Sequence, residues 1–220
     1  ANRFGRISPT EAAHVRAELG DAVRLILDGG RCGVGIESTI LDLSRGAGEA
    51  PRVLRPGAIT PEQIASVLGR LPDIAGQPPG ADAAAVPRVP GALAAHYAPL
   101  TPLRLLPASE IARLAETATA GERCALLCHS PMPATPTAAL LARQLPADPA
   151  RYAHQLYAAL RELDDLGADL ILVEDVPSTA AWAAIADRLR RAARGAGGTH
   201  TRPSSPTRSS PLAVPPRAEA

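Results

Sequence analysis

Short apolar runs and amphipathic stripes alternate along the second half of the chain. The stripe in residues 150–167 is the strongest, because five of its apolar side chains recur at helical spacing, namely Tyr152, Leu156, Ala159, Leu160 and Leu163. Continuous apolar runs that are typical of buried parallel strands occupy residues 103–106, 124–128 and 168–174. Further helices are predicted over residues 109–117, 136–145 and 180–194. This alternation predicts a small parallel or mixed sheet within residues 101–194.

The first 71 residues carry helix-capping signals and shorter strand patterns. The sequence Ser-Pro-Thr-Glu at residues 8–11 has the spacing of a capping box, which predicts a helix over residues 9–19 with Ser8 as its N-cap. Thr-Pro-Glu-Gln at residues 60–63 repeats that pattern ahead of a short helix. Strands are predicted over residues 22–27, 38–44 and 51–55.

Two other segments have compositions that do not suit a packed core. Prolines recur through residues 72–100, with glycine and alanine between them, and predict an extended linker. Residues 195–220 are rich in Gly, Ser, Pro, Thr and Arg and predict a disordered tail. The chain is therefore expected to divide into residues 1–71, the linker, residues 101–194 and the tail.

Composition and charge narrow the class of protein. The 220 residues suit one large domain or two small ones, and 46% hydrophobic residues are enough for a core. A net charge of +1 does not indicate a nucleic-acid or anionic-membrane partner. An odd count of three cysteines fits a reducing compartment, so a cytoplasmic location is expected. No apolar run approaches the roughly 18 to 20 residues of a membrane span.

Some chemical motifs can be set aside from the sequence. Cys124, Cys128 and His129 are near one another in sequence, but the two cysteines of an extended strand lie roughly 13 Å apart at about 3.3 Å per residue. One metal ion cannot bridge that distance, so buried structural cysteines are expected. Gly33 and Gly35 form neither a GxGxxG motif nor a P-loop, so neither familiar nucleotide site is supported.

Three polar residues in the first part of the chain are candidates for an anion site. Ser8 is placed at a predicted helix N-terminus, which attracts anions. Ser38 precedes a strand, and Arg55 follows the next strand just before Pro-Gly, where its guanidinium can pair with phosphate or carboxylate. Each residue alone is more often structural, but their co-occurrence favours an anionic ligand.

Two other groups of residues leave alternatives open or favour a structural role. His96 and Tyr97 end the predicted linker. Tyr97 either anchors the linker on the second domain, or the pair belongs to a mobile segment that closes over a ligand. The arginines of the last predicted helix, Arg188, Arg190 and Arg191, are expected to form a solvated face.

A family resemblance emerges when these motifs are taken in order. The chain resembles the long, two-domain form of L-threonylcarbamoyladenylate synthase, which has a YrdC-like domain, a linker and a Rossmann-like C-terminal domain. The segments that carry the resemblance are ANRFGRISPT, ILDGG, GIESTILDL, LRPGAIT, PGALAAHYAP, YAALRELDDLGADLILVE and DRLRRAA. The resemblance implies an α/β fold: the C-terminal part of a YrdC-like twisted-sheet domain, a Pro-rich linker and a small Rossmann-like α/β domain.

The resemblance also implies a reaction. The family makes threonylcarbamoyl-AMP from L-threonine, bicarbonate and ATP, releases pyrophosphate, and supplies the threonylcarbamoyl modification of tRNA adenosine. Magnesium is expected with the ATP phosphates. Membrane binding and direct tRNA binding are not expected, because the product passes to a separate tRNA threonylcarbamoyl-transfer machinery.

The family's binding residues carry over to positions that match its motifs. Ser8, Arg55, His96 and Tyr97 match ATP contacts, and Ser38 matches a threonine contact. The resemblance assigns no catalytic side chain and no metal ligand in this chain.

The chain also departs from the family pattern. The family usually reads Ser-Ala-Asn-x-Ser-Gly, whereas this chain begins at Ala1 and has Phe4 in place of the second serine. The resemblance implies that the first half of the YrdC-like domain lies upstream, so the chain is interpreted as an N-terminally truncated fragment that is inactive alone. If residue 1 is the true start, a non-catalytic nucleotide- or protein-binding module is the alternative. A carbamoyltransferase would need zinc-finger or acylphosphatase-like segments, and neither is seen.

Overall fold

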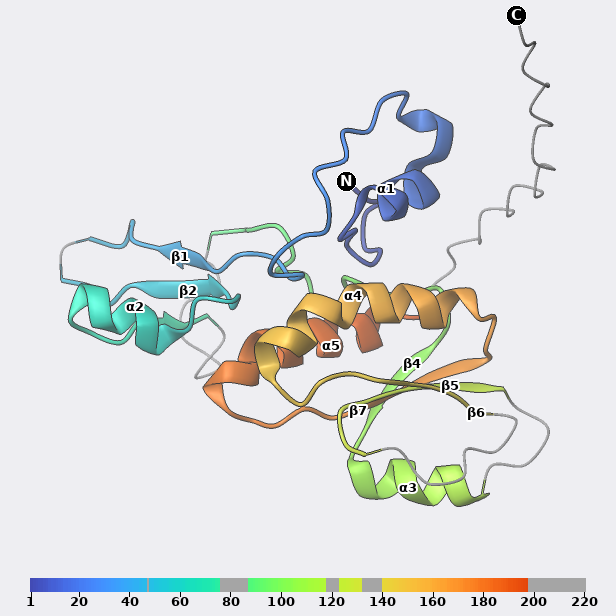
Figure 1. Ribbon diagram of the computed structural model, residues 1–220. Helices are drawn as coiled ribbons and strands as arrows, with labels where there is room; N and C mark the ends of the chain where they lie inside the picture. Colours follow the sequence, from blue (N-terminus) through green and yellow to red (C-terminus); the bar gives the residue numbers. More distant parts are fainter. Residues whose placement is uncertain (47, 76–86, 118–122, 132–139, 198–220) are drawn as a thin grey trace, which may run out of the picture.

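The chain forms two β-sheets with helices around them. The segment that precedes residue 100 leads from the first sheet to the second. The computed structural model describes residues 1–46, 48–75, 87–117, 123–131 and 140–197 (Figure 1). A three-stranded sheet belongs to the first part of the chain and a four-stranded parallel sheet to the second. No helix within these ranges is long and apolar enough to cross a membrane.

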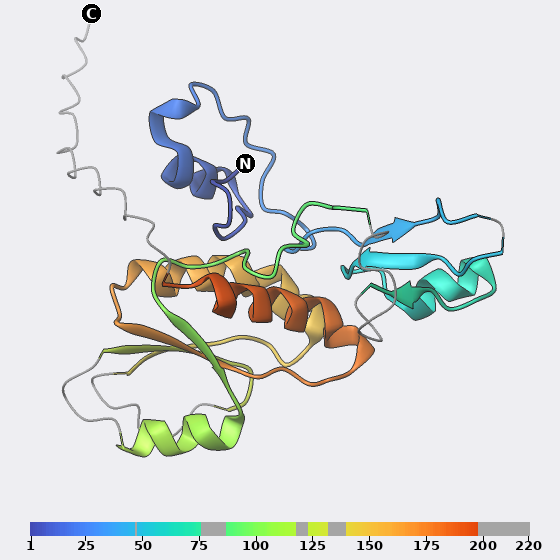
Figure 2. The same cartoon turned by 180° about the vertical axis from the view of Figure 1, so that it is seen from behind.

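The parallel sheet forms the middle of three layers. Its strands are ordered β4-β7-β5-β6 and span Leu103–Leu106, Leu170–Glu174, Cys124–Cys128 and Leu140–Gln144. Helices α4 and α5 cover one face and helix α3 covers the other, as the two opposite views show (Figures 1 and 2). These helices span Pro149–Asp165, Ala183–Gly195 and Ala108–Thr117. The architecture confirms the predicted α/β class.

Alternate residues of the central strands supply the two cores. Leu127 and Val173 belong to the cluster under α4 and α5, whereas Leu126 and Leu172 belong to the cluster on the α3 side. Strands that are buried on both faces read as continuous apolar runs, which is why β5 and β7 were predictable. Helix α4 is also as predicted, since all five residues of its apolar stripe are buried.

The helix predicted over residues 136–145 is wrong. Residues 140–144 form β6, which pairs in parallel register with all five residues of β5, from Cys124↔Leu140 to Cys128↔Gln144. Residues 136–139 lie outside the described part of the chain. Leu, Ala, Arg and Gln all favour helix, but the free edge of β5 offers this segment a full hydrogen-bond ladder, and the tertiary pairing overrides local propensity.

The smaller sheet is built around β2. Strand β2, Arg52–Arg55, pairs antiparallel with β1, Ile40–Asp42, and parallel with the two-residue β3, Asp73–Ile74. Strand β3 falls in the stretch predicted as a linker, so the first residues of that stretch extend this sheet. Helix α2, Pro61–Leu68, follows β2 and begins with the predicted capping box of Thr60 and Gln63.

Two predictions near the N-terminus are wrong. Helix α1 spans Ala12–Leu19, so it begins three residues later than predicted, and Ser8 is not its N-cap. Residues 22–27 form no strand, and the side chains of Leu25 and Leu27 are 74% and 85% exposed. A mostly apolar run does not by itself make a strand, because an extended segment needs a neighbouring edge to satisfy its backbone groups.

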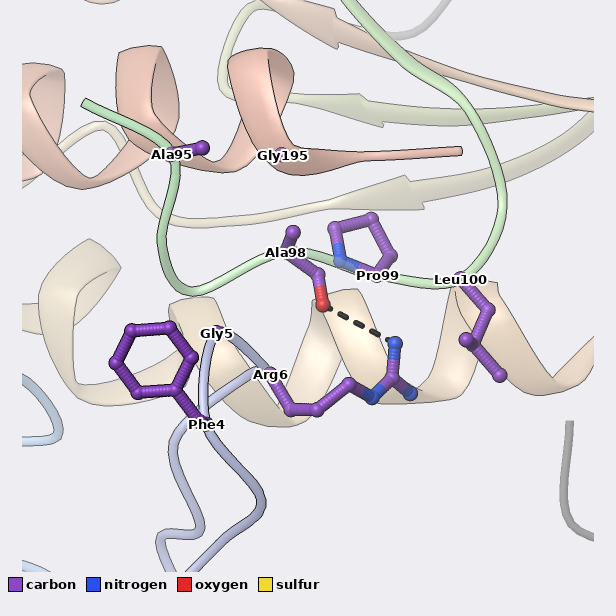
Figure 3. A pocket seen from close by; sticks show the side chains of 8 residues that line it. All are labelled: Phe4, Gly5, Arg6, Ala95, Ala98, Pro99, Leu100 and Gly195. Carbon is purple, nitrogen blue, oxygen red and sulfur yellow. Dashed lines mark hydrogen bonds between the residues drawn. The ribbon is translucent and has the colours of Figure 1, made fainter. Parts of the chain in front are cut away.

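The N-terminal segment and the end of the linker are tied together against α4. A β-bridge joins Arg6 to Ala98, and the N–H group of Ala98 donates to the carbonyl oxygen of Gly5 over 2.8 Å. The Arg6 guanidinium also donates to the carbonyl oxygen of Ala98 at the wall of a small, largely apolar cavity of about 200 Å³ (Figure 3). Asp164 of α4 accepts hydrogen bonds from the N–H groups of Leu100 and Thr101. These contacts hold the segment that carries His96 and Tyr97.

Candidate active site

A cavity of about 370 Å³ lies where the N-terminal segment, the β1–β2 region and the linker meet. Four of the five predicted site residues line it, namely Ser8, Arg55, His96 and Tyr97. The fifth, Ser38, is hydrogen-bonded to Arg55. Residues separated by up to 89 positions in sequence, from Ser8 to Tyr97, thus share one site.

Arg55 joins two walls of this cavity. The residue ends β2 and is 8% exposed. Its Nε donates to the carbonyl oxygen of Ser38 over 3.0 Å, and its second guanidinium nitrogen donates to the Ser38 hydroxyl over 3.2 Å. Another guanidinium nitrogen donates to the carbonyl oxygen of Pro90 over 2.9 Å. These bonds use three of the five N–H donors of an arginine, so donor capacity remains for an anion.

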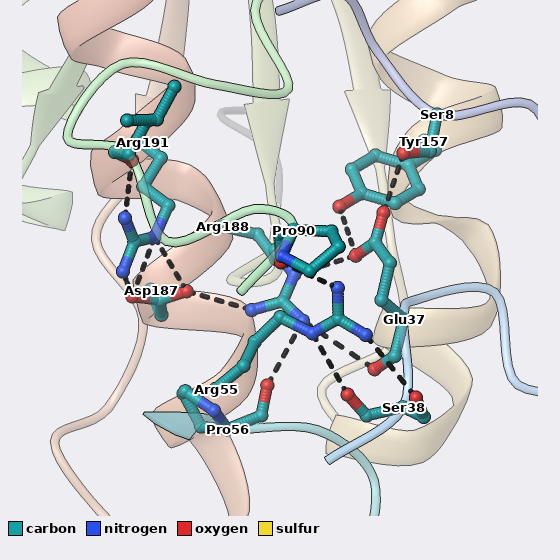
Figure 4. Close-up of polar contacts among 11 residues, drawn as sticks. Ser8, Glu37, Ser38, Arg55, Pro56, Pro90, Tyr157, Asp187, Arg188 and Arg191 are labelled. Atoms are coloured by element: carbon teal, nitrogen blue, oxygen red, sulfur yellow. Dashed lines mark hydrogen bonds and ion pairs between the residues drawn. The ribbon is translucent and has the colours of Figure 1, made fainter. Parts of the chain in front are cut away.

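Glu37 is the polar centre of the site and was not predicted (Figure 4). Its carboxylate accepts hydrogen bonds from the Ser8 hydroxyl over 2.5 Å, from the Tyr157 hydroxyl over 2.9 Å and from Nε of Arg188 over 2.7 Å. Ser8 therefore serves this carboxylate instead of capping a helix. A glutamate beside a glycine-rich turn has no sequence signal for this role, because its partners lie on other elements.

The electrostatics of Glu37 follow from those partners. Burial by itself would raise the pKa of the Glu37 carboxyl group, but the charge of Arg188 and the hydrogen bonds from Ser8 and Arg188 outweigh it. The pKa of Glu37 therefore lies below its usual value, and the group is ionised at neutral pH. The same surroundings act on Tyr157, whose pKa is raised well above its usual value by burial and then by the negative charge of Glu37.

Arg188 contradicts the prediction of a solvated arginine face. It is 1% exposed and forms ion pairs with Glu37 and with Asp187. Arg191 also pairs with Asp187, and only Arg190 is exposed as expected. The prediction for Arg188 was wrong because an arginine on a helix is buried only when partners elsewhere in the fold neutralise its charge, and the local sequence does not show those partners.

Tyr97 closes one side of the cavity and anchors the linker. The ring is 2% exposed, its centroid lies 5.8 Å from that of Tyr157 on α4, and its backbone has a φ of 61°. The structural alternative, an anchor on the second domain, is therefore confirmed. The idea of a mobile segment that closes over a ligand stays a hypothesis.

Two buried polar atoms in this wall have no hydrogen-bond partner in the part of the chain that the structure describes. They are the Tyr97 hydroxyl oxygen and Nδ1 of His96. Burial raises the pKa of Tyr97 and lowers the pKa of His96, so both are neutral in this state at neutral pH. Buried polar groups are rarely left unpaired, and both residues line the cavity, which favours a bound ligand with polar groups.

Gly91 lets the linker fold closely over Tyr97. Its φ is +78°, and a Cβ atom at this position would lie 1.8 Å from the Tyr97 hydroxyl oxygen. A second close approach occurs at Gly35, where φ is +85° and a Cβ atom would lie 2.4 Å from Cα of His154 on α4. The Gly35 contact seats the segment that carries Glu37 against the second half of the chain.

Cys124 and Cys128 lie away from this cavity. Cys128 is buried in the core on the α3 side, and Cys124 is packed against the same cluster. Nδ1 of His129 lies 3.1 Å from a carboxylate oxygen of Glu174, at the end of β7. Within the described ranges, no three His, Cys, Asp or Glu side chains are grouped so that they could hold a metal ion.

Comparisons with known proteins decide the family. A family model described as "Threonylcarbamoyl-AMP synthase, C-terminal domain" matches residues 59–194, and a model described as "Telomere recombination" matches residues 1–57. The chain belongs to the threonylcarbamoyl-AMP synthase family. A member from Bacillus subtilis is 36% identical over 201 residues, which cover 89% of this chain and 56% of that protein. A member from Pyrococcus abyssi is 30% identical over 87% of this chain and 56% of that protein.

Solved structures of the family agree with the fold. The structure of the Sua5 protein of P. abyssi in complex with L-threonine superposes with a TM-score of 0.70 at 29% identity, covering 88% of this chain and 56% of that one. A variant of the same protein, with alanine in place of an adjacent histidine and tyrosine, also has a TM-score of 0.70, at 28% identity and with 88% and 55% coverage. The chain thus spans about half the length of the relatives it matches.

Proposed function

We propose that this chain supplies the binding residues for ATP and L-threonine in the synthesis of threonylcarbamoyl-AMP. The overall reaction joins L-threonine, bicarbonate and ATP and releases pyrophosphate and one water, which is lost when the threonine amine and bicarbonate form the carbamate. One observation carries the proposal: Ser8, Arg55, His96 and Tyr97 line a single cavity, and Ser38 is held by Arg55 at its edge. Membership of the family supports the same reading, since the curated relatives bear the name of this enzyme.

The proposed roles follow the chemistry of the side chains. Arg55 binds ATP phosphates, because a guanidinium pairs with phosphate through parallel hydrogen bonds. Ser8, His96 and Tyr97 complete the ATP site, and the unpartnered atoms of His96 and Tyr97 are suited to polar groups of the nucleotide. Ser38 binds L-threonine. The P. abyssi protein has been solved with L-threonine bound, and it has also been solved as a variant in which an adjacent histidine and tyrosine are replaced by alanine.

The reaction needs little covalent help from the protein. A carbamate oxygen of N-carboxythreonine attacks the α-phosphorus of ATP, the new P–O bond replaces the bond to pyrophosphate, and pyrophosphate leaves. Positioning of two anionic reactants and stabilisation of charge on the phosphate carry most of such a step. Arg55 provides that positive charge, and no side chain is assigned as a nucleophile.

Magnesium enters this scheme with ATP as part of the substrate. Mg²⁺ prefers oxygen ligands and is usually held by substrate phosphates with one or two carboxylates. Glu37 lines the cavity, but its oxygens already accept hydrogen bonds from Ser8, Tyr157 and Arg188. The described residues therefore fit an ion that the phosphates bring with them and not a dedicated protein site.

The product is a mixed anhydride, which makes it a donor of the threonylcarbamoyl group. We propose that it passes to a tRNA threonylcarbamoyl-transfer machinery in the cytoplasm, and that this chain does not itself bind tRNA. The net charge of +1 supports that last point, since tRNA binding is driven by basic surfaces.

Pyrophosphate release from ATP tests the proposal. The assay compares the 220-residue chain with a version extended upstream in the same reading frame, each with and without L-threonine and bicarbonate. Release that depends on both co-substrates, in either version, supports the function. Release from the extended version alone would identify the upstream segment as necessary. If the amount of pyrophosphate released does not depend on threonine in either version, a non-catalytic binding module would be favoured instead.

A further inference from the structure

Arg188 extends from α5, in the second half of the chain, to the Glu37 carboxylate behind the cavity wall (Figure 4). Its Nε donates to the Glu37 carboxylate over 2.7 Å, and one of its terminal nitrogens donates to the carbonyl oxygen of Pro56 over 3.0 Å. Its guanidinium carbon lies 5.1 Å from the centre of the Tyr97 ring. One buried side chain thus contacts three segments that are remote from one another in sequence.

Two of the contacts are made to neighbours of residues with proposed roles, and the third is made to Tyr97, which has a proposed role itself. Glu37 precedes Ser38, Pro56 follows Arg55, and Tyr97 follows His96. Arg188 itself is absent from the cavity wall. It is therefore placed to hold the walls of the site without touching the substrates.

The guanidinium is itself held in one orientation. Another of its nitrogens donates to the Asp187 carboxylate over 2.7 Å, and the same carboxylate accepts two bonds of 2.9 Å from Nε of Arg191. One planar guanidinium contacts Asp187, Glu37, Pro56 and the Tyr97 ring at the same time. A lysine ammonium cannot reproduce this set of contacts, because it is a compact charge without the planar fork of donors. A buried charge with this many partners is costly to disturb.

We propose that Arg188 is a positioning residue through which helix α5 sets the geometry of the three binding segments. The expected effect of Arg188 on catalysis rests on the proposed function. Its effect on the position of the three segments rests only on the contacts described above. It gives the C-terminal α/β unit a defined task, which is to hold the Glu37, Pro56 and Tyr97 segments in register for two substrates. A misplacement of about 1 Å in such a site can cost on the order of 10²-fold in rate.

Hydrogen exchange of the 220-residue chain tests the structural part. Arg188→Gln is compared with Arg190→Gln, an exposed position two residues further along α5. Peptides covering residues 52–58 and 92–98 are expected to exchange at least about tenfold faster in Arg188→Gln, while residues 170–174 of the parallel sheet keep their protection. The second peptide is informative because the N–H groups of His96 and Ala98 are hydrogen-bonded to Arg191 and Gly5.

The result can go against the proposal in two ways. Unchanged exchange in both peptides would show that the contacts of Arg188 do not hold these segments. Equal loss of protection in residues 170–174 would show that Arg188 supports the whole fold and has no selective effect on the site. If Arg188→Gln does not fold, Arg188→Lys is used in the same measurement, because it keeps the charge but loses the planar contacts.

Kinetics test the consequence for catalysis, in whichever version of the protein releases pyrophosphate. Arg188→Gln is expected to lower kcat/KM for both ATP and threonine by about 10²-fold, with Arg188→Lys intermediate and Arg190→Gln within about twofold of the parent. The double variant Arg188→Gln with Glu37→Gln is expected to lose no more than the worse single variant, since the two residues act as a pair. Additive losses would overturn the pairing. Absence of pyrophosphate release from the parent protein would overturn the proposed function, and the exchange result would still decide the role of Arg188.

Discussion

Arg55 donates hydrogen bonds to both the carbonyl oxygen and the hydroxyl group of Ser38. The arginine ends one strand, and the serine lies just before the antiparallel neighbour of that strand, so the two are brought together by the smaller sheet. In the proposed function these are the ATP-binding and threonine-binding residues. On that proposal, the pairing of these two side chains would hold a nucleotide and an amino acid side by side.

Arg55→Ala is expected to weaken ATP binding more than threonine binding. Loss of a charge-assisted hydrogen bond to phosphate costs about 1.5–3 kcal/mol, which corresponds to roughly 10- to 150-fold in affinity. Isothermal titration with ATP and with L-threonine measures both effects in the version that binds them. Arg52→Ala, at the other end of the same strand, is the matched control. Unaltered ATP affinity in Arg55→Ala would remove this residue from the site.

Tyr97→Phe tests whether the Tyr97 hydroxyl contacts a ligand or only contributes to the stability of the fold. The hydroxyl groups of Tyr97 and Tyr152 are both buried without a partner in the described part of the chain, but only Tyr97 lines the cavity. Removing an unpaired buried hydroxyl is nearly neutral for stability, so neither Tyr97→Phe nor Tyr152→Phe is expected to lower the free energy of unfolding in urea by more than about 0.5 kcal/mol.

The two tyrosine variants are expected to differ in ligand binding. Tyr97→Phe should weaken ATP binding by about fivefold, the value of one neutral hydrogen bond, whereas Tyr152→Phe should leave ATP affinity unchanged. Equal affinities in the two variants would show that the Tyr97 hydroxyl makes no contact with the nucleotide.

Gly91→Ala is expected to displace the Tyr97 segment. An alanine Cβ there would meet the Tyr97 hydroxyl oxygen at 1.8 Å, in a backbone conformation with a φ of +78°. Gly69→Ala is the matched control, because its φ is +73° and a Cβ atom would have nothing within 4 Å. Strain alone costs about 1 kcal/mol in Gly69→Ala, and the clash should make Gly91→Ala measurably less stable in urea unfolding. Similar losses in both variants would argue against close packing of residue 91 on Tyr97.

Asp164→Asn is expected to loosen the end of the linker. The buried carboxylate accepts hydrogen bonds of 2.9 and 2.8 Å from the N–H groups of Leu100 and Thr101, and it also lies 3.4 Å from the Arg6 guanidinium. Hydrogen bonds to charged groups contribute about 1.5–3 kcal/mol each, so a loss of about 2 kcal/mol in the free energy of unfolding is expected. Asp165→Asn, its exposed neighbour, should change stability by less than about 0.5 kcal/mol. A stable Asp164→Asn variant would mean that these bonds do not tether the linker.

Glu37 gives stability a specific dependence on pH. Its folded-state pKa lies below the usual value of 4.5, so the ionised form stabilises the fold above about pH 4.5, and this contribution is lost as the pH falls through the lower folded-state pKa. The groups that face the carboxylate are Arg188 from α5, Tyr157 from α4, Ser8 from the N-terminal segment, and His96 and Tyr97 from the linker.

Comparison with Glu37→Gln isolates that contribution. The difference in free energy of unfolding between the parent chain and Glu37→Gln should be constant from about pH 6 to about pH 8. It should shrink below about pH 4.5. Chemical denaturation at each pH measures it, and a His96→Gln background in both chains removes the titration of His96, whose pKa responds to the charge of Glu37. A difference that stayed constant down to about pH 3 would show that Glu37 is not held as a carboxylate in the fold.

Local sequence determined much of the secondary structure. Helix α4 was predictable because its apolar side chains repeat within three or four residues, and α2 because Thr60 and Gln63 satisfy each other's backbone groups. The runs that form β5 and β7 were predictable because strands buried on both faces need apolar side chains throughout. The ordered motifs also identified the family, the four predicted residues that line the cavity, and Ser38, which is hydrogen-bonded to one of them.

Tertiary structure decided the features that depend on distant partners. Residues 140–144 became a strand because β5 offered an edge, and residues 22–27 formed no strand although their run is mostly apolar. Arg188 is buried because Glu37, 151 positions away, neutralises it, and Ser8 binds that same carboxylate instead of capping α1. Propensity and capping act over a few neighbouring residues, so sequence patterns express them directly. Charge pairing and sheet edges act between segments that only the folded chain brings together.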